Sequence, residues 1–287
     1  MDSRTIGNVK VSAVGLGGMP MSVEGRPDED RSLRTIHKAL DLGITLIDTA
    51  DAYCLGAHEV GHNERLIAKG LATWSGDASK VLVATKGGHT RDADEDDGDW
   101  GLNGRPEYLK RACEASLKAL GVEAIGLYQF HRPDPAVPHA ESVGAFKDLQ
   151  DEGKVRMVGL SNASIEQIEE SRRIVDIASV QNEFSPRFRS SEDELEYCAR
   201  EGIAFLPWSP LGGMGSAADL GSEHSAFAAV AEARGVSPQQ VAIAWHLAKA
   251  EVVIPIPGSS RPETIADSAQ AVELELDPEE LRKLDAG

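Results

Sequence analysis

Basic residues are scarce in this sequence of 287 amino acids. Lys and Arg together number 29 against 47 Asp and Glu, which gives a formal net charge of −18. Proteins that bind nucleic acids neutralise phosphates with stripes of Lys and Arg. This excess of acidic residues therefore argues against a nucleic-acid partner. An anionic cofactor would need a nearby cation to offset its repulsion by the net negative charge of the chain.

Cysteine and long apolar runs are also nearly absent. The three cysteines, Cys54, Cys113 and Cys198, are far apart and form no Cys-x-x-Cys pair. No apolar run approaches the roughly 18 residues that span a bilayer, and residues 1–10 are polar rather than signal-like. We therefore expect a cytoplasmic protein with no membrane segment and no disulfides. Cys54 directly follows Tyr53, so it is the thiol that we single out for oxidation near a site.

Histidines with metal-ligand spacing are missing as well. His58, His62, His89 and His139 form no His-x-His pair and no cluster with carboxylates. A metal-dependent barrel hydrolase places such ligands at its strand ends. We therefore expect no metal.

What the sequence does contain is a regular alternation of apolar runs and amphipathic segments. The runs are continuous, as in strands that are buried on both faces. Eight strand–helix units at this spacing predict parallel strands with right-handed crossovers that close into an α/β (β/α)8 TIM barrel, a single domain over residues 1–287. The predicted strands are Val11–Leu16, Ile44–Asp48, Val81–Lys86, Ile125–His131, Val155–Ser161, Ser179–Asn182, Ala204–Trp208 and Val252–Pro255, and the predicted helices are Arg31–Leu42, His62–Leu71, Pro106–Leu120, Ala140–Asp151, Ile165–Val175, Glu192–Arg200, 225–234, 238–249, 262–271 and 278–285.

An open doubly wound sheet is the alternative fold. It would need a Gly-x-Gly-x-x-Gly turn that leads from the first strand into a helix, but Gly15–Gly18 is followed by Met19-Pro20. Two stretches, 87–104 and 209–224, interrupt the alternation and read as long loops after strands.

Four polar residues stand at or just past strand ends, where a barrel gathers its catalytic groups: Asp48, Tyr53, Lys86 and His131. A phenol is a weak acid at neutral pH, and a nearby ammonium lowers its pKa. Lys86 suits that task, Asp48 would hold the ammonium, and His131 would orient a carbonyl oxygen. Taken singly, each residue also fits a loop cap, a packing aromatic or a solvated charge, so the prediction depends on the four acting together.

With these motifs the chain resembles the aldo-keto reductase family over nearly its whole length. Asp48 and Tyr53 meet the family pattern of an Asp followed five residues later by a Tyr. The Lys of Val83-Ala-Thr-Lys86 and the His of Leu127-Tyr-Gln-Phe-His131 match the family Lys and His. The resemblance implies that these four form a catalytic tetrad with Tyr53 as general acid.

The resemblance also implies residues for a nicotinamide cofactor. Ser161, Asn162 and Gln181 match the residues that hold the carboxamide. Trp208 stands where the family places an aromatic side chain against the nicotinamide ring, although a buried core aromatic is its alternative role. Trp208 begins the motif Trp-Ser-Pro-Leu-Gly, which resembles the start of the family loop that crosses the cofactor pyrophosphate. The resemblance therefore adds Ser209, Leu211 and Gly212 to the expected cofactor-binding residues.

A segment before the helix at 262–271 corresponds to the family's contact with the adenosine 2′-phosphate. Gly258 stands where some members carry Lys, so we expect Ser259, Ser260 and Arg261 to take over that contact. On this basis we expect NADP(H) rather than NADH. Asp267 stands where many members have a Glu against the adenine.

The resulting hypothesis is an NADPH-dependent reductase of a small-molecule aldehyde or ketone. Two alternatives stay open: an alcohol, sugar or polyol dehydrogenase, and a poorly catalytic cofactor-sensing protein. Trp100, Met19 and Met21 are expected to form an apolar wall for the substrate. Arg132 either attracts a carboxylate or phosphate of the substrate or is a solvated rim charge. The oligomeric state stays open.

Overall fold

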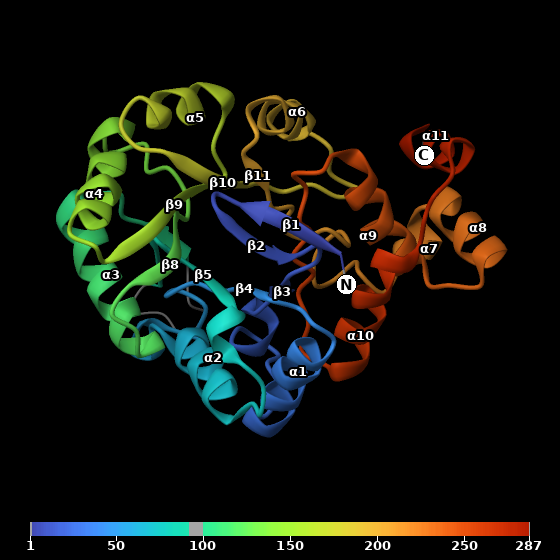
Figure 1. The fold of residues 1–287 in the computed structure, drawn as a ribbon, viewed down its shortest axis with the longest axis horizontal. Helices are drawn as coiled ribbons and strands as arrows, with labels where there is room; N and C mark the ends of the chain where they lie inside the picture. The colour runs from blue at the N-terminus through green and yellow to red at the C-terminus, as the bar shows by residue number, and fades with distance from the viewer. Residues whose placement is uncertain (1, 92–99, 287) are drawn as a thin grey trace.

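A parallel sheet of seven strands curls around the centre of the molecule (Figure 1). The computed structural model describes residues 2–91 and 100–286. The strands pair in the order β11-β10-β9-β8-β5-β4-β3, in which every pairing is parallel. Their bounds are β3 (Leu16–Gly17), β4 (Leu46–Asp48), β5 (Leu82–Gly87), β8 (Ile125–Phe130), β9 (Val155–Ser161), β10 (Ile177–Gln181) and β11 (Ala204–Phe205).

An irregular eighth segment, residues 253–258, closes this sheet into a barrel. Single parallel bridges join Phe205 to Val253 on one side and Gly17 to Gly258 on the other. Pro255 and Pro257 have no N–H to donate, but their carbonyls accept from the amides of Gly15 and Gly17 at 2.9 and 3.0 Å. The predicted (β/α)8 barrel is therefore confirmed, with the eighth strand reduced to a proline-interrupted seam.

The helices form a ring around the barrel, except that α7, α8 and α11 lie outside one side of it (Figure 1). Local signals set several helix ends. A capping box of Ser164 and Gln167 starts α5, and Gly121, in the left-handed region, ends α3. The bounds are α1 (Glu29–Asp41), α2 (His62–Thr73), α3 (Pro106–Leu120), α4 (His139–Asp151), α5 (Ile165–Arg172), α6 (Glu192–Glu201), α7 (Leu220–Glu223), α8 (Ser225–Arg234), α9 (Pro238–Lys249), α10 (Pro262–Gln270) and α11 (Pro278–Ala286), with short 3₁₀ turns η1 (Met19–Met21), η2 (Ala57–Glu59), η3 (Ala78–Lys80) and η4 (Ala271–Glu273).

Across residues 2–91 and 100–286, no helix combines the length and apolarity that crossing a membrane requires.

The predicted first strand, Val11–Leu16, is wrong. An antiparallel hairpin of β1 (Ser3–Ile6) and β2 (Val9–Ser12) precedes the barrel, and only Leu16 and Gly17 belong to the first barrel strand. Ile6 and Val11 are buried against apolar residues at the barrel axis. The hairpin therefore plugs one end of the barrel. The polar composition of residues 1–10 hid this element, since each of its strands buries little beyond one side chain.

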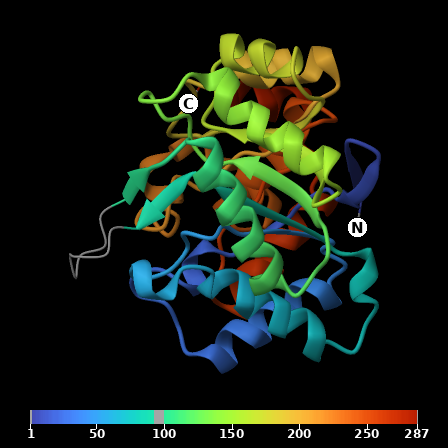
Figure 2. The same cartoon turned by 90° about the vertical axis from the view of Figure 1, so that its left-hand side faces the viewer.

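The two predicted loops are also more ordered than expected. The stretch 87–104 contains an antiparallel ribbon of β6 (His89–Arg91) and β7 (Trp100–Leu102), and residues 92–99 lie outside the described part. In Figure 2 this ribbon lies on the left and the β1–β2 hairpin on the right, at opposite ends of the barrel. The stretch 209–224 contains helix α7.

The hairpin plug gives a test of stability. Ile6 is fully buried, and we expect Ile6→Ala to lower the free energy of unfolding by about 2–4 kcal/mol, because it leaves a cavity at the barrel axis. Urea unfolding followed by circular dichroism measures the change. Val122→Ala, at a position that is 44% exposed, is the control and should change stability by less than about 0.5 kcal/mol. Equal effects of the two substitutions would contradict the plug.

Candidate active site

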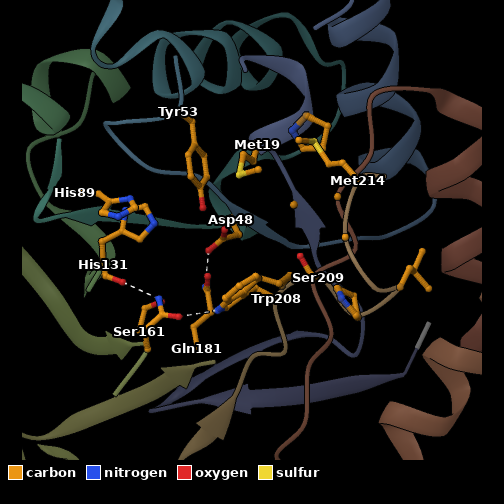
Figure 3. Close-up of a pocket in the computed structure, with 18 of the residues that line it drawn as sticks. Met19, Asp48, Tyr53, His89, His131, Ser161, Gln181, Trp208, Ser209 and Met214 are labelled. Carbon is orange, nitrogen blue, oxygen red and sulfur yellow. Dashed lines mark hydrogen bonds between the residues drawn. The ribbon is translucent and has the colours of Figure 1, made fainter. Parts of the chain in front are cut away.

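The ammonium of Lys86 lies at the centre of a buried polar cluster. Its Nζ donates to Asp48 Oδ2 at 2.6 Å, to the Thr49 carbonyl at 2.9 Å and to the Tyr53 hydroxyl at 3.0 Å. Lys86 is the second-last residue of β5, Asp48 ends β4, and Tyr53 lies on the loop after β4, so neighbouring parallel strands bring the three together. Figure 3 shows the Tyr53 hydroxyl pointing toward Asp48.

The protonation states of this cluster follow from burial and charge. Burial lowers the pKa of Lys86, but the charge of Asp48 and the contacts with Tyr53 outweigh it, so its pKa is raised and the ammonium stays charged. Burial raises the pKa of Tyr53, and Lys86 opposes that effect only in part. The sequence argument expected the ammonium to lower the phenol pKa. Desolvation exceeds that influence here, so Tyr53 is a neutral proton donor at neutral pH.

His131 packs beside Tyr53 as a neutral ring. The two rings meet edge to face with centroids 5.6 Å apart. Burial, and then the charge of Lys86, hold the pKa of His131 well below its usual range. Within the described residues its Nδ1 is buried without a hydrogen-bond partner. His131 can therefore share a hydrogen bond with a ligand but carries no charge near neutral pH.

Two glutamines hold the second oxygen of Asp48. Gln181 Nε2 donates to Asp48 Oδ1 at 2.7 Å (Figure 3). Gln129 Nε2 lies 3.4 Å from the same atom. Gln181 was predicted to bind a cofactor, and it also fixes the carboxylate. Gln129 was missed. Its position two residues before His131 was the available signal, because residues two apart on a strand point the same way.

Asn162 links the ends of three further strands. Its Nδ2 donates to the His131 carbonyl at 3.0 Å and to Ser161 Oγ at 2.9 Å, and its Oδ1 accepts from Trp208 Nε1 at 3.2 Å. Asn162 adopts φ of 56°, a left-handed conformation that Asn tolerates better than most residues. The network fixes the edge of the Trp208 indole beside the predicted carboxamide-binding residues.

These groups surround a cavity of about 320 Å³ at the carboxyl ends of the strands. Lys86 lies behind the wall, in contact with Asp48 and Tyr53. Met19 and Trp100 line the cavity as predicted, but Met21 is buried in the core against α1 and α2 and does not. The predicted site residues in the lining are Asp48, Tyr53, His131, Ser161, Asn162, Gln181, Trp208, Ser209, Leu211 and Gly258.

The cavity lining does not include five residues that were predicted to bind the cofactor: Gly212, Ser259, Ser260, Arg261 and Asp267. Ser259, Ser260 and Arg261 immediately precede α10, with Ser259 Oγ bonded to the Arg261 carbonyl at 2.9 Å. Asp267 instead faces α9, where it accepts from Ser237 Oγ and Gln240 Nε2. These contacts compete with the predicted adenine contact of Asp267.

Gly258 allows a close approach between the seam and the loop after β3. A Cβ at this position would lie 2.9 Å from Pro20 Cγ. The Lys that some family members carry there therefore does not fit this chain without a shift of Pro20.

The β6–β7 ribbon contributes a row of aromatic contacts that the sequence did not reveal. The His89 ring packs against His131 with centroids 4.6 Å apart and planes tilted by 46°, and Trp100 packs against His89 with centroids 4.9 Å apart. Arg91 lies over the Trp100 ring at 4.2 Å and bonds to Glu24 at 2.7 Å, which ties the ribbon to the loop before α1. His89 and Arg91 lie close to Trp100 because β6 and β7 pair with each other. The Gly- and Asp-rich sequence of this stretch does not predict that pairing.

The described part of the chain places neither a metal site nor a reactive thiol at this cavity. Within residues 2–91 and 100–286, no group of three His, Cys, Asp or Glu side chains is arranged to hold a metal ion. Cys54 is buried, and burial raises its thiol pKa to about 11, so the oxidation-prone thiolate is suppressed.

The comparisons with known proteins agree with this geometry. Residues 13–286 match the model of the aldo/keto reductase family. An uncharacterized oxidoreductase of Schizosaccharomyces pombe is 34% identical over 284 residues, which cover 98% of this chain and 88% of that protein.

Two solved structures are similar over almost the whole chain. A glycerol dehydrogenase from Gluconobacter oxydans has a TM-score of 0.84 at 29% identity, covering 99% of this chain and 94% of that one. An aldo/keto reductase from Klebsiella pneumoniae, in complex with NADP and acetate, has a TM-score of 0.79 at 26% identity, covering 96% of this chain and 91% of that one. With its barrel, its Asp48–Lys86–Tyr53 cluster and the match over residues 13–286, this chain belongs to the aldo/keto reductase family of oxidoreductases.

Proposed function

We propose that this protein reduces an aldehyde or ketone to an alcohol with NADPH, and that Tyr53 is the general acid. The observation that carries the proposal is the Tyr53 hydroxyl 3.0 Å from a buried, charged Lys86 whose other partner is Asp48. A proton donor with a charge-stabilised conjugate base, placed at a cavity wall, suits protonation of a carbonyl oxygen.

The residues of the cavity fit a nicotinamide ring. Ser161 and Asn162 provide hydroxyl and amide groups, and Trp208 provides a flat face, all in the lining of one cavity. The Klebsiella pneumoniae relative was solved in complex with NADP, which supports the same cofactor class here. A reduced nicotinamide dinucleotide supplies a hydride to the substrate carbon when it is bound.

The protein's own residues handle the proton. Tyr53 donates its hydroxyl proton to the substrate oxygen, and the phenolate that remains is stabilised by Lys86 at 3.0 Å. Asp48, held by Gln181, keeps the ammonium in place at 2.6 Å. Neutral His131, edge-on to Tyr53, positions the substrate oxygen by a hydrogen bond.

The segment before α10 supports NADPH over NADH. Arg261 lies at the N-terminus of α10, where amides and a guanidinium together favour a phosphate. Arg31 of α1 reaches the same segment, with Nε 3.2 Å from the Ser260 carbonyl. In a chain of net charge −18, these cations provide the local attraction that a 2′-phosphate needs.

The reverse reaction, oxidation of an alcohol, is the second candidate. It uses the same residues with Tyr53 as the base, and the similarity to a glycerol dehydrogenase favours considering it.

Removing the Tyr53 hydroxyl tests the general acid. We expect Tyr53→Phe to lower kcat for aldehyde reduction by about 10²- to 10⁴-fold, the usual contribution of general acid catalysis. NADPH absorbance measures turnover, and quenching of protein fluorescence shows that the cofactor still binds. Tyr197→Phe removes a hydroxyl that bonds to Arg172 away from the cavity, so it should keep nearly full activity. Near-normal turnover of Tyr53→Phe would refute the assignment.

The pH profile tests the protonation states. Burial raises the pKa of Tyr53, and burial together with the charge of Lys86 depresses that of His131. Between these two pKa values both groups stay neutral, so kcat for reduction should be flat from about pH 6 to pH 8. A step near the ordinary histidine pKa would show that His131 titrates in the working enzyme.

Removing the Arg261 charge tests the cofactor. We expect Arg261→Gln to raise KM for NADPH by about 10- to 100-fold and to leave KM for NADH within about twofold, because only NADPH carries the 2′-phosphate. Arg156→Gln, at an exposed position near the start of β9, is the matched control. Equal changes with both cofactors would exclude a phosphate contact of Arg261.

A further inference from the structure

Arg132 brings a cation to the active-site cavity. It directly follows His131 and lines the cavity that contains Tyr53 and His131. Among the described residues of that lining it is the only Lys or Arg, and its side chain is partly buried. Arg132 therefore borders the space that the substrate would fill.

The guanidinium of Arg132 lacks a partner within the described part of the chain, as neither a hydrogen bond nor an ion pair engages it. Comparable arginines are engaged: Arg26 with Glu59, Arg91 with Glu24 and Arg172 with Glu201. Taking a guanidinium partly out of water without a counter-ion has a free-energy cost. Since none of the described residues pairs with it, Arg132 is suited to bind an anionic ligand.

The charged groups around Arg132 leave room for such an anion. Glu183 is close enough to interact electrostatically with Arg132. Burial raises the pKa of Glu183, and the positive charge of Arg132 lowers that pKa in part. No nitrogen of Arg132 lies within the 4.0 Å of a Glu183 carboxylate oxygen that would define an ion pair. His89 and His131 also face Arg132, and both are neutral, because burial lowers the pKa of His89 to about 4 and that of His131 well below its usual range.

The rest of the cavity wall is largely apolar. Met19, Pro20, Trp100, Leu211 and Met214 line it. The wall suits a substrate with an apolar body, and a single guanidinium matches one carboxylate, which it binds with two parallel hydrogen bonds. A doubly charged phosphate would be expected to draw on more cations than this one.

We propose that Arg132 selects carbonyl substrates that carry a carboxylate. This inference rests on the proposed reductase function and names its substrate class. The carboxylate binds the Arg132 guanidinium while the carbonyl oxygen lies at Tyr53 and His131. Since the chain carries a net charge of −18, Arg132 also offsets the repulsion that an anionic substrate meets at the cavity.

Matched pairs of aldehydes test the proposal. The probes are meta- and para-carboxybenzaldehyde and their methyl esters, which keep the aldehyde and the ring but lose the charge. With NADPH, the wild-type protein should show a higher kcat/KM for at least one acid than for its ester. Arg132→Gln should lower kcat/KM for that acid by about 10- to 100-fold, the size expected for a charged hydrogen-bonded pair, and change the ester by less than about threefold.

Two further variants separate charge from structure. Arg132→Lys should recover part of the loss for the acid, because it keeps the charge but not the planar fork. Arg156→Gln should change neither substrate. If Arg132→Gln lowers both acid and ester equally, the role is structural and the proposal fails. If the wild type prefers the esters, the substrate class is wrong while the reductase function stands. If no aldehyde consumes NADPH, the proposed function itself fails.

Discussion

The buried ion pair of Lys86 and Asp48 is the interaction on which the rest of the site depends. Two charges inside a barrel cost free energy to desolvate, and they persist only where every lone pair and proton has a partner. Asp48 uses one oxygen for Lys86 and the other for Gln181, and Lys86 uses its further protons for Thr49 and Tyr53. The position of the Tyr53 hydroxyl is therefore a consequence of satisfying the lysine.

Barrel closure brings the remaining parts to this pair. Many of the residues that surround it lie at the ends of the parallel strands or on the loops that follow them, so parallel pairing fixes where these strand ends lie. Asn162 then joins the ends of β8, β9 and β11 by three hydrogen bonds, so the His131 and Trp208 positions depend on each other. A side chain at the end of one strand is therefore positioned by hydrogen bonds to residues at the ends of other strands as well as by its own loop.

The sequence predicted the barrel and most of the cavity because strand ends are marked by residue type. The apolar run before Lys86 and the family motif around Tyr53 are local signals. The β1–β2 hairpin and the contact of His89 with His131 depend on pairing between segments, which no local pattern encodes. The pKa of Tyr53 was misjudged for a related reason, since burial is a property of the closed barrel and not of neighbouring residues.

The proline-interrupted seam has a consequence for local opening. Pro255 and Pro257 offer no amide protons, so residues 253–258 can make fewer backbone hydrogen bonds to the adjoining strands than a proline-free strand of the same length. Native-state opening is expected to begin where backbone bonding is sparsest. The same segment contains Gly258 and is followed by Arg261, so a dinucleotide that binds there would hold this join of the barrel closed. Cofactor occupancy and the rigidity of the whole fold would then be thermodynamically linked.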